Sequence, residues 1–273
     1  MEPRATRVGV VQFTSTAAVE QNLHAVERTV RRAVLEGAEV VLVPESFAYL
    51  GPESGKFSVA ESIEDSGPVL DRMKSLAKET GAHLVLGGHI ERGHRNTHVR
   101  NSSVHLAPTG EVKAVYRKIH LFDVDLPDGT HLLESDTVEA GTEIVTSELP
   151  FGRLGHSICY DLRFPELYRK LVDQGAVALA VPSAFTMTTG KHHWHVLLRA
   201  RAIEQQSYVL AAAQTGKHHG SRQSYGHAMI VDPWGTILAQ VGEGEGTAVA
   251  TVDPHVVQKV RRSLPSLAHR KLG

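Results

Sequence analysis

The segment Gly155-His156-Ser157-Ile158-Cys159-Tyr160-Asp161-Leu162-Arg163-Phe164-Pro165-Glu166 carries the only cysteine of the chain. Leu154 to Ile158 has the pattern of a short buried strand that stops at Cys159, and Pro165 suits the first turn of a helix. A thiol between a strand and a helix meets backbone N–H groups and a helix dipole, which favour a thiolate and can stabilise an oxyanion. The segment therefore predicts a catalytic nucleophile at Cys159; the alternative is a buried structural cysteine.

On the amino-terminal side of this segment, predicted strands and helices alternate. Val8 to Phe13 and Val40 to Val43 are predicted strands, and Ala18 to Leu35 is a predicted helix with apolar residues on one face. The second strand is apolar throughout, which is typical of a parallel strand covered on both faces. Further predicted elements are a helix from Gly67 to Gly81, a strand from His83 to Gly87, and a hairpin of Thr97 to Leu106 with Val112 to Arg117. This order indicates an α/β fold with a mixed sheet.

The second half of the chain has a similar layout. After the helix that begins at Pro165 come predicted strands at Val177 to Val181, Tyr208 to Ala213, His227 to Val231, Thr236 to Gln240 and Thr247 to Val252, and a helix at His192 to Gln206. Pro-x-Gly turns at Pro108 and Pro233 join one hairpin in each half. Two sheets packed face to face and covered outside by helices satisfy this pattern, and one wide doubly wound sheet is the alternative.

The length and charge of the chain limit the classes of protein to which it can belong. The chain has 273 residues and a net charge of −1, so it can bury a large core and has no basic surface for nucleic acid or membranes. We expect one domain over residues 1–273, with an irregular functional loop from Asp123 to Thr142. A single cysteine excludes an internal disulfide framework, and no signal peptide or membrane-spanning run is visible. We therefore expect a cytoplasmic protein that acts on small molecules.

Histidine is abundant, with 17 residues, and the clusters His192-His193-Trp194-His195 and His218-His219 raise the question of a zinc site. No Cys-x-x-Cys or His-Glu-x-x-His spacing accompanies them. Histidines on solvated helices and loops are the ordinary explanation, so we predict no metal site.

Three residues with complementary chemistry follow predicted strands. Glu45 comes just after Val40 to Val43, Lys118 just after Val112 to Arg117, and Cys159 after its own strand. Because α/β folds gather functional groups at the carboxyl ends of strands, we expect the three to converge. Glu45 would take the thiol proton and later activate water, while Lys118 would hold the charge on a carbonyl oxygen. No Gly-x-Ser-x-Gly motif for a serine nucleophile is present. No Gly-x-Gly-x-x-Gly or Walker motif is present either, so the sequence shows no binding motif for hydride or phosphoryl transfer.

These stretches resemble the nitrilase superfamily of carbon–nitrogen hydrolases, and the likeness covers nearly the whole chain. It rests on Pro44-Glu45-Ser46-Phe47, Tyr116-Arg117-Lys118-Ile119-His120-Leu121-Phe122 and Cys159-Tyr160-Asp161-Leu162-Arg163-Phe164-Pro165-Glu166, in this order. Further stretches are similar to the Nit branch of its amidases: Phe122-Asp123-Val124-Asp125 with Glu134-Ser135, Pro182-Ser183-Ala184-Phe185 with Thr188-Thr189-Gly190, Arg199-Ala200-Arg201-Ala202-Ile203-Glu204, and residues 224–235. One departure is His195, where family members often carry a glutamate.

The resemblance implies an αββα sandwich without a cofactor. It implies a catalytic triad of Glu45, Lys118 and Cys159, with Glu134 as a second active-site glutamate. It also implies at least a homodimer, formed through the helices following the nucleophile and the Thr-Thr-Gly loop, here Phe164 to Gln174 and His192 to Gln206.

Three residues match positions that would contact the acyl part of a substrate with an α-keto acid, namely Arg163, Phe185 and Thr189, and Tyr160 is a further expected substrate-binding residue. Arg163 has an alternative role, an internal ion pair with a carboxylate such as Glu166.

The function implied by the resemblance is hydrolysis of an amide through a cysteine thioester, with deaminated glutathione giving 2-oxoglutarate and cysteinylglycine. One alternative is omega-amidase action on 2-oxoglutaramate, which differs only in the leaving group. Another is a catalytically silent binding protein, although such a protein has no need of all three triad residues. The leaving-group preference depends on pocket walls that include Tyr49 to Lys56 and Thr215 to Gln223, which the sequence does not place.

Overall fold

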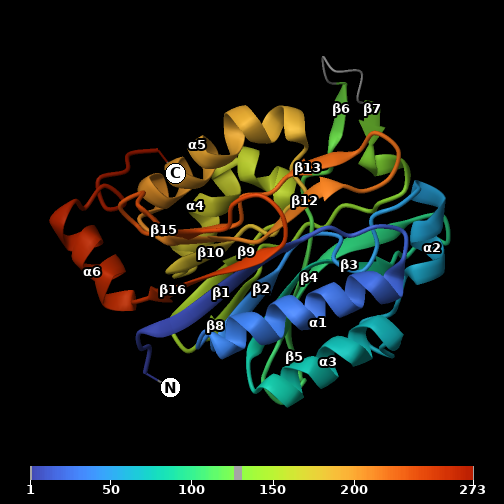
Figure 1. Cartoon of the computed structure of the whole chain (residues 1–273). Helices are drawn as coiled ribbons and strands as arrows, with labels where there is room; N and C mark the ends of the chain where they lie inside the picture. Colours follow the sequence, from blue (N-terminus) through green and yellow to red (C-terminus); the bar gives the residue numbers. More distant parts are fainter. Residues whose placement is uncertain (1, 126–130, 273) are drawn as a thin grey trace.

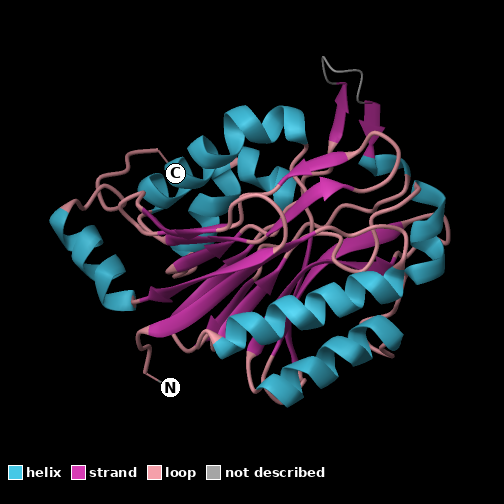
Figure 2. Ribbon diagram, in the orientation of Figure 1, coloured by secondary structure: helices cyan, strands magenta, loops and turns pink. Residues whose placement is uncertain are grey.

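The computed structural model of the chain describes residues 2–125 and 131–272, and in it two β-sheets pack face to face between two layers of helices (Figure 1, Figure 2). The prediction of an αββα sandwich is confirmed, and the alternative of one wide sheet is wrong. No helix within the described ranges is long and apolar enough to cross a membrane.

The first sheet is mixed. Its order is β13 (Gln223–Tyr225), β12 (Ala213–Lys217), β1 (Thr6–Phe13), β2 (Val40–Val43), β3 (His83–Arg92), β4 (Val99–Leu106) and β5 (Val112–Arg117), and β16 (Gly246–Val252) also pairs with β1. Strands β1, β2 and β3 are parallel, whereas β4, β5 and β16 run antiparallel to their neighbours. The outer face is covered by α1 (Val19–Leu35) and α3 (Pro68–Thr80).

The second sheet has a parallel centre and antiparallel edges. Its order is β15 (Ile237–Gln240), β14 (Met229–Val231), β11 (Tyr208–Ala211), β10 (Ala178–Ala180), β9 (Gly152–His156) and β8 (Thr146–Leu149). Helices α4 (Pro165–Asp173) and α5 (Met187–Gln205) cover it on the outside. The remaining elements are α2 (Lys56–Val59), α6 (Pro254–Ser263), the small β6 (Asp123–Asp125) and β7 (His131–Leu133) pair, and 3₁₀ helices at Glu53–Gly55, Glu134–Asp136 and Cys159–Arg163.

Strand β2 shows why its sequence is apolar throughout. Val40 and Leu42 point into the core between the two sheets, whereas Val41 and Val43 point into the core beneath α1 and α3. Alternate side chains of a strand lie on opposite faces, so a strand buried on both faces needs apolar residues at every position. Four consecutive apolar residues thus position the chain end that carries Glu45.

Several sequence-based boundaries need correction. The segment Asp123 to Thr142 was expected to be irregular, but it contains β6, β7 and the 3₁₀ turn of Glu134. The expected strand Tyr208 to Ala213 is wrong at its end, because β11 stops at Ala211 and Ala213 starts β12 in the other sheet. Helix α5 begins at Met187 rather than His192, because the Thr186 side chain caps it by accepting the N–H of Thr189. The sequence interpretation also missed α2, α6, β8 and β13.

Candidate active site

The three residues of the predicted triad come together at one edge of the sandwich. Glu45 follows β2, Lys118 follows β5, and Cys159 follows β9 of the second sheet by three residues. All three line a cavity of about 350 Å³, a volume suited to a small-molecule ligand. The same cavity is also lined by the other predicted site residues, namely Glu134, Tyr160, Arg163, Phe185 and Thr189.

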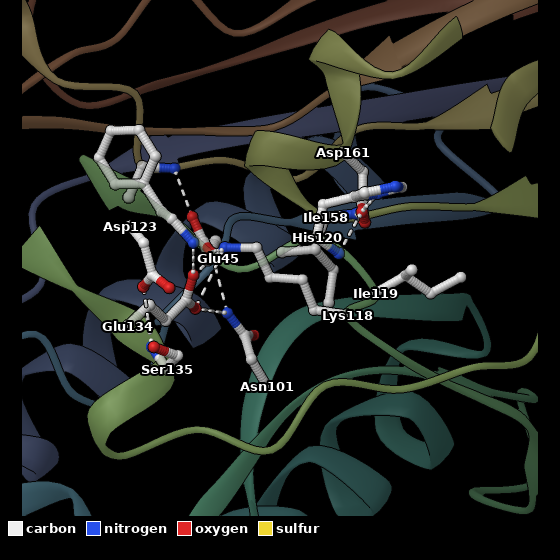
Figure 3. A network of polar contacts seen from close by, with 12 residues as sticks. Glu45, Asn101, Lys118, Ile119, His120, Asp123, Glu134, Ser135, Ile158 and Asp161 are labelled. Carbon is white, nitrogen blue, oxygen red and sulfur yellow. Dashed lines mark hydrogen bonds and ion pairs between the residues drawn. The ribbon is translucent and has the colours of Figure 1, made fainter. Parts of the chain in front are cut away.

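Glu45 is a buried carboxylate held from three directions (Figure 3). Its Oε1 accepts hydrogen bonds from Lys118 Nζ at 3.1 Å and Asn101 Nδ2 at 2.9 Å, and its Oε2 accepts the backbone N–H of Ala184 at 2.9 Å. Hydrogen bonds to both oxygens therefore hold the Glu45 carboxylate in one orientation at the cavity wall.

Lys118 lies between two carboxylates. Its Nζ is 3.1 Å from Glu45 Oε1 and 2.8 Å from Glu134 Oε2, and its side chain is almost fully buried. Burial alone would lower the pKa of Lys118, but the charges of Glu134 and Glu45 outweigh burial and raise it above its ordinary value. The lysine is therefore an ammonium ion, fixed in place by its two carboxylate partners.

Glu134 reaches this site from the 3₁₀ turn after β7. In addition to Lys118, it accepts the backbone N–H of Phe122 at 2.7 Å and Asn101 Nδ2 at 3.3 Å (Figure 3). Burial would raise the pKa of Glu134, but the attraction of Lys118 dominates and lowers it. Glu134 is thus ionised and acts as the second anionic partner of the lysine.

Cys159 occupies a strained turn. Its φ is 49°, in the left-handed region that residues with a side chain rarely adopt, and its N–H donates to Pro182 O at 3.0 Å. Burial and then the Glu45 carboxylate raise the pKa of the thiol well above its ordinary value, and the charge of Lys118 offsets this only in part. The resting sulfur is therefore a thiol, and the nearby base with the geometry to remove its proton is Glu45.

The expected helix start at Pro165 is confirmed, but the expectation that a helix dipole favours a thiolate at Cys159 needs correction. Cys159 begins a five-residue 3₁₀ helix, and α4 starts only at Pro165. The 3₁₀ helix thus separates Cys159 from α4, and burial together with the Glu45 carboxylate raises the thiol pKa rather than lowering it.

Asp161 joins the turn of Cys159 to the strand end of Lys118. Its fully buried carboxylate accepts the backbone N–H of Ile158 at 2.8 Å and the hydroxyl of Tyr116 at 2.6 Å. It also accepts two hydrogen bonds from His120, which Figure 3 shows next to Lys118. The sequence interpretation missed Asp161, although its position two residues after the cysteine was the available signal.

Asn101 and Gly88 also escaped the sequence interpretation. Asn101 lies in β4 and donates to both active-site glutamates, yet an asparagine in an alternating strand gives no sequence signal of this role. Gly88 has a φ of 74°, and a Cβ there would lie 2.8 Å from Asn101 Oδ1 and 3.0 Å from Glu45 Cγ. Glycine is therefore required for this close approach.

Arg163 faces the cavity. Its guanidinium lies 5.3 Å from the ring centre of Phe185 and 5.8 Å from that of Tyr160, and its Nη1 is 3.2 Å from His193 Nδ1. It makes no ion pair with Glu166, although both residues lie in the described part of the chain, so the alternative of an internal pair is wrong. Thr189 lines the same cavity from the first turn of α5.

The histidine clusters have separate local partners. His195 contacts Gln240 and the rings of Tyr225 and His227, at the position where a glutamate is common in the family that the sequence resembles. His218 hydrogen-bonds Ser15 O and Ser224 Oγ. Within residues 2–125 and 131–272, no group of three His, Cys, Asp or Glu residues has the arrangement of a metal site.

Residues 7–262 match the family model described as carbon-nitrogen hydrolase. A Synechocystis sp. protein named deaminated glutathione amidase is 46% identical over 263 residues, which cover 95% of this chain and 96% of that protein. A Mus musculus protein of the same name is 44% identical over 268 residues, which cover 97% of this chain and 83% of that protein.

Solved structures show the same likeness in three dimensions. The Caenorhabditis elegans NitFhit protein is similar with a TM-score of 0.93 and 39% identity, over 99% of this chain and 66% of that one. A Saccharomyces cerevisiae member of branch 10 of the nitrilase superfamily is similar with a TM-score of 0.88 and 31% identity, over 98% of this chain and 97% of that one.

Proposed function

The chain belongs to the carbon-nitrogen hydrolase family, and from this premise we propose that it hydrolyses the amide bond of deaminated glutathione to 2-oxoglutarate and cysteinylglycine. As a member of this family it is a hydrolase of carbon–nitrogen bonds. Relatives at 46% and 44% identity carry this substrate in their names, which supports the choice of amide.

In the first half of the proposed reaction, Cys159 Sγ attacks the amide carbonyl carbon and its proton passes to Glu45. The negative charge that develops on the carbonyl oxygen is stabilised by the Lys118 ammonium. We propose the backbone N–H of Tyr160 as the second donor, since Tyr160 lines the cavity and the N–H of Cys159 already binds Pro182 O. The carbon–nitrogen bond then breaks, and Glu45 returns the proton to the leaving nitrogen of cysteinylglycine.

In the second half, water hydrolyses the thioester on Cys159. Glu45, again ionised, takes a proton from water as the oxygen attacks the thioester carbon. The carbon–sulfur bond breaks, 2-oxoglutarate leaves, and the sulfur recovers its proton from Glu45. Glu134 keeps Lys118 charged and in place through both halves.

The observation that carries this proposal is the Lys118 ammonium, bound by Glu45 and Glu134 in the cavity that Cys159 lines. The test is a side-by-side measurement of kcat/KM for deaminated glutathione and 2-oxoglutaramate with purified protein. A higher kcat/KM for deaminated glutathione is the expected result. A preference for 2-oxoglutaramate would assign omega-amidase action instead, and turnover of neither substrate would reject the proposal.

The proposal includes a cytoplasmic homodimer. A catalytic thiol that must stay reduced suits a reducing compartment. Apolar side chains that are exposed in the single chain lie along α5 and the β14–β15 hairpin, and they are Val196 (65%), Ile203 (48%), Trp234 (62%) and Leu238 (43%). Such a patch favours a second copy over solvent. Sedimentation of the wild type and of Val196→Asp tests this, with a dimer expected for the first and dissociation for the second.

A further inference from the structure

The cavity has a second group of cationic side chains apart from Arg163. Lys56 follows the 3₁₀ turn after β2, and Arg222 comes from the β12–β13 hairpin; both line the cavity. Figure 1 shows α2 and this hairpin at the end of the molecule where β6 and β7 lie. We infer that Lys56 and Arg222 form a second anion-binding subsite, which holds a carboxylate on the amine that leaves from Cys159.

The two cations share one carboxylate partner, Glu53. Lys56 Nζ forms an ion pair with Glu53, and Arg222 Nη1 lies 4.0 Å from Glu53 Oε1. Thr137 Oγ1 also donates to Glu53, at 3.2 Å, which fixes this carboxylate between the two cations. Lys56 and Arg222 thus place two cationic groups at the cavity wall on either side of the Glu53 carboxylate, and the acidic Asp136 lines the same cavity.

Arg222 has N–H donors that are not used within the fold as described. Among the described residues its guanidinium has no hydrogen bond, and its ion pair with Glu53 is long, at 4.0 Å. Arg100, which also lines the cavity, is by contrast engaged, with Glu139 at 3.3 Å and Glu91 at 3.8 Å. A guanidinium offers five N–H donors in a planar fork that matches a carboxylate, so Arg222 can bind a ligand carboxylate without losing an internal partner.

Lys56 lies on the side of the cavity near the second glutamate. The charge of Lys56 helps to lower the pKa of Glu134. Burial, which raises this pKa, and Lys118 and the Phe122 N–H, which lower it, have larger effects. Arg163, on the other hand, contacts Tyr160, Phe185 and His193, and none of these residues touches Glu53. The cavity thus has two separate cationic groups.

This inference rests on the proposed function, whose substrate has a carboxylate at each end and the scissile amide between them. The leaving cysteinylglycine extends over two residues, or about 7 Å, from the scissile nitrogen to its carboxylate. Ammonia, which leaves from 2-oxoglutaramate, has no such group. A second cationic subsite would therefore select amides whose amine carries a carboxylate, and it would give no advantage to 2-oxoglutaramate.

The test compares Arg222→Gln and Lys56→Gln with Lys217→Gln, a matched control on the same hairpin that is exposed and does not line the cavity. Substrates are deaminated glutathione, its glycine-amidated form and 2-oxoglutaramate. The ratio of kcat/KM for deaminated glutathione to that for 2-oxoglutaramate should fall about 10- to 100-fold in each cavity variant, the range for a charge-assisted contact. The control should keep the wild-type ratio. Amidation of the glycine carboxylate should lower the wild-type value similarly, with no further loss in Arg222→Gln.

A second measurement separates this subsite from the proposed substrate. Alanylglycine, which lacks a thiol, should inhibit hydrolysis of 2-oxoglutaramate by the wild type, with an inhibition constant about tenfold higher in Arg222→Gln. If deaminated glutathione is not cleaved but this inhibition depends on Arg222, the proposed function fails and the subsite stands. An unchanged ratio in both cavity variants, or no inhibition by alanylglycine, overturns the subsite.

Discussion

The Asp161 carboxylate accepts both the backbone N–H of His120 at 3.1 Å and its ring Nδ1 at 2.7 Å. Asp161 is two residues from Cys159, the proposed nucleophile, and His120 is two residues from Lys118. These contacts therefore join the 3₁₀ helix Cys159–Arg163, which follows β9 of the second sheet, to the segment that follows β5 of the first sheet. We expect Asp161 to position the cysteine and the lysine relative to each other.

Asp161→Asn should lower kcat at least ~10-fold with little change in KM, because a shift on the order of 1 Å between catalytic groups costs up to ~10² in rate. The second measurement is the rate of Cys159 alkylation as a function of pH. If Asp161 positions the cysteine, the substitution changes the thiol environment and shifts this pH profile. If Asp161 has only a structural role, the pH profile stays as in the wild type. Tyr116→Phe, which removes one of the donors, is the milder matched variant. A lower melting temperature with unchanged kcat and alkylation profile would reduce Asp161 to a structural role.

Cys159 should be the nucleophile. Because it is the only cysteine, iodoacetamide should inactivate the protein with one label per chain, and Cys159→Ala should have no activity. Mass spectrometry of the enzyme quenched during turnover should find a substrate-derived acyl group on this residue. Residual activity of Cys159→Ala close to the wild-type level would refute the assignment.

Glu45→Gln should lower kcat by at least ~10², the range typical of general acid–base catalysis. The buried thiol has a raised pKa, so the substitution removes the base that we propose for its proton. Steady-state kinetics with deaminated glutathione measures the effect. Glu166→Gln, an exposed glutamate on α4, is the control and should keep wild-type activity.

Arg163 should recognise the α-keto acid carboxylate. Arg163→Lys removes the bidentate fork, so the ratio of kcat/KM for 2-oxoglutaramate over a neutral amide of similar size should fall roughly tenfold. Melting temperatures of both proteins should agree, since Arg163 has no carboxylate partner among residues 2–125 and 131–272. An unchanged ratio with a lower melting temperature would place Arg163 in the scaffold.

Stability should fall in acid because of His156, which lies buried between Ser147 and Ser103. Burial lowers the pKa of His156 to about 4, whereas in the unfolded chain it is about 6.5. The unfolded state therefore binds more protons between these values, so this contribution is fully present above pH ~6.5 and is lost as the pH falls toward 4.

Urea unfolding from pH 4.5 to 7 measures this effect. His156→Gln should reduce the slope of unfolding free energy against pH by up to about 1.4 kcal/mol per pH unit, which is one proton per chain. His24→Gln, at an exposed position of α1, should keep the wild-type slope. Equal slopes in all three proteins would contradict a neutral buried His156.

The sequence by itself predicted the elements that carry the triad. The apolar run of β2 indicates a strand that is buried on both faces. Gly81 marks the end of α3, because its φ of 66° is a left-handed conformation that glycine adopts readily. The three triad residues each follow a strand, and all three line one cavity as the sequence predicted. The motifs around them also predicted the family, which the comparisons confirm.

Other features depended on contacts between distant parts of the chain. The donors Asn101 and Ala184 reach Glu45 across 56 and 139 residues of sequence, and the chain changes sheets at Ala212 within an unbroken apolar run. Periodicity reports only whether a side chain is buried; which strand lies beside it depends on sheet pairing. The tertiary structure therefore decided which groups hold each side chain of the proposed triad, because hydrogen bonds of about 3 Å form only when packing brings distant segments together.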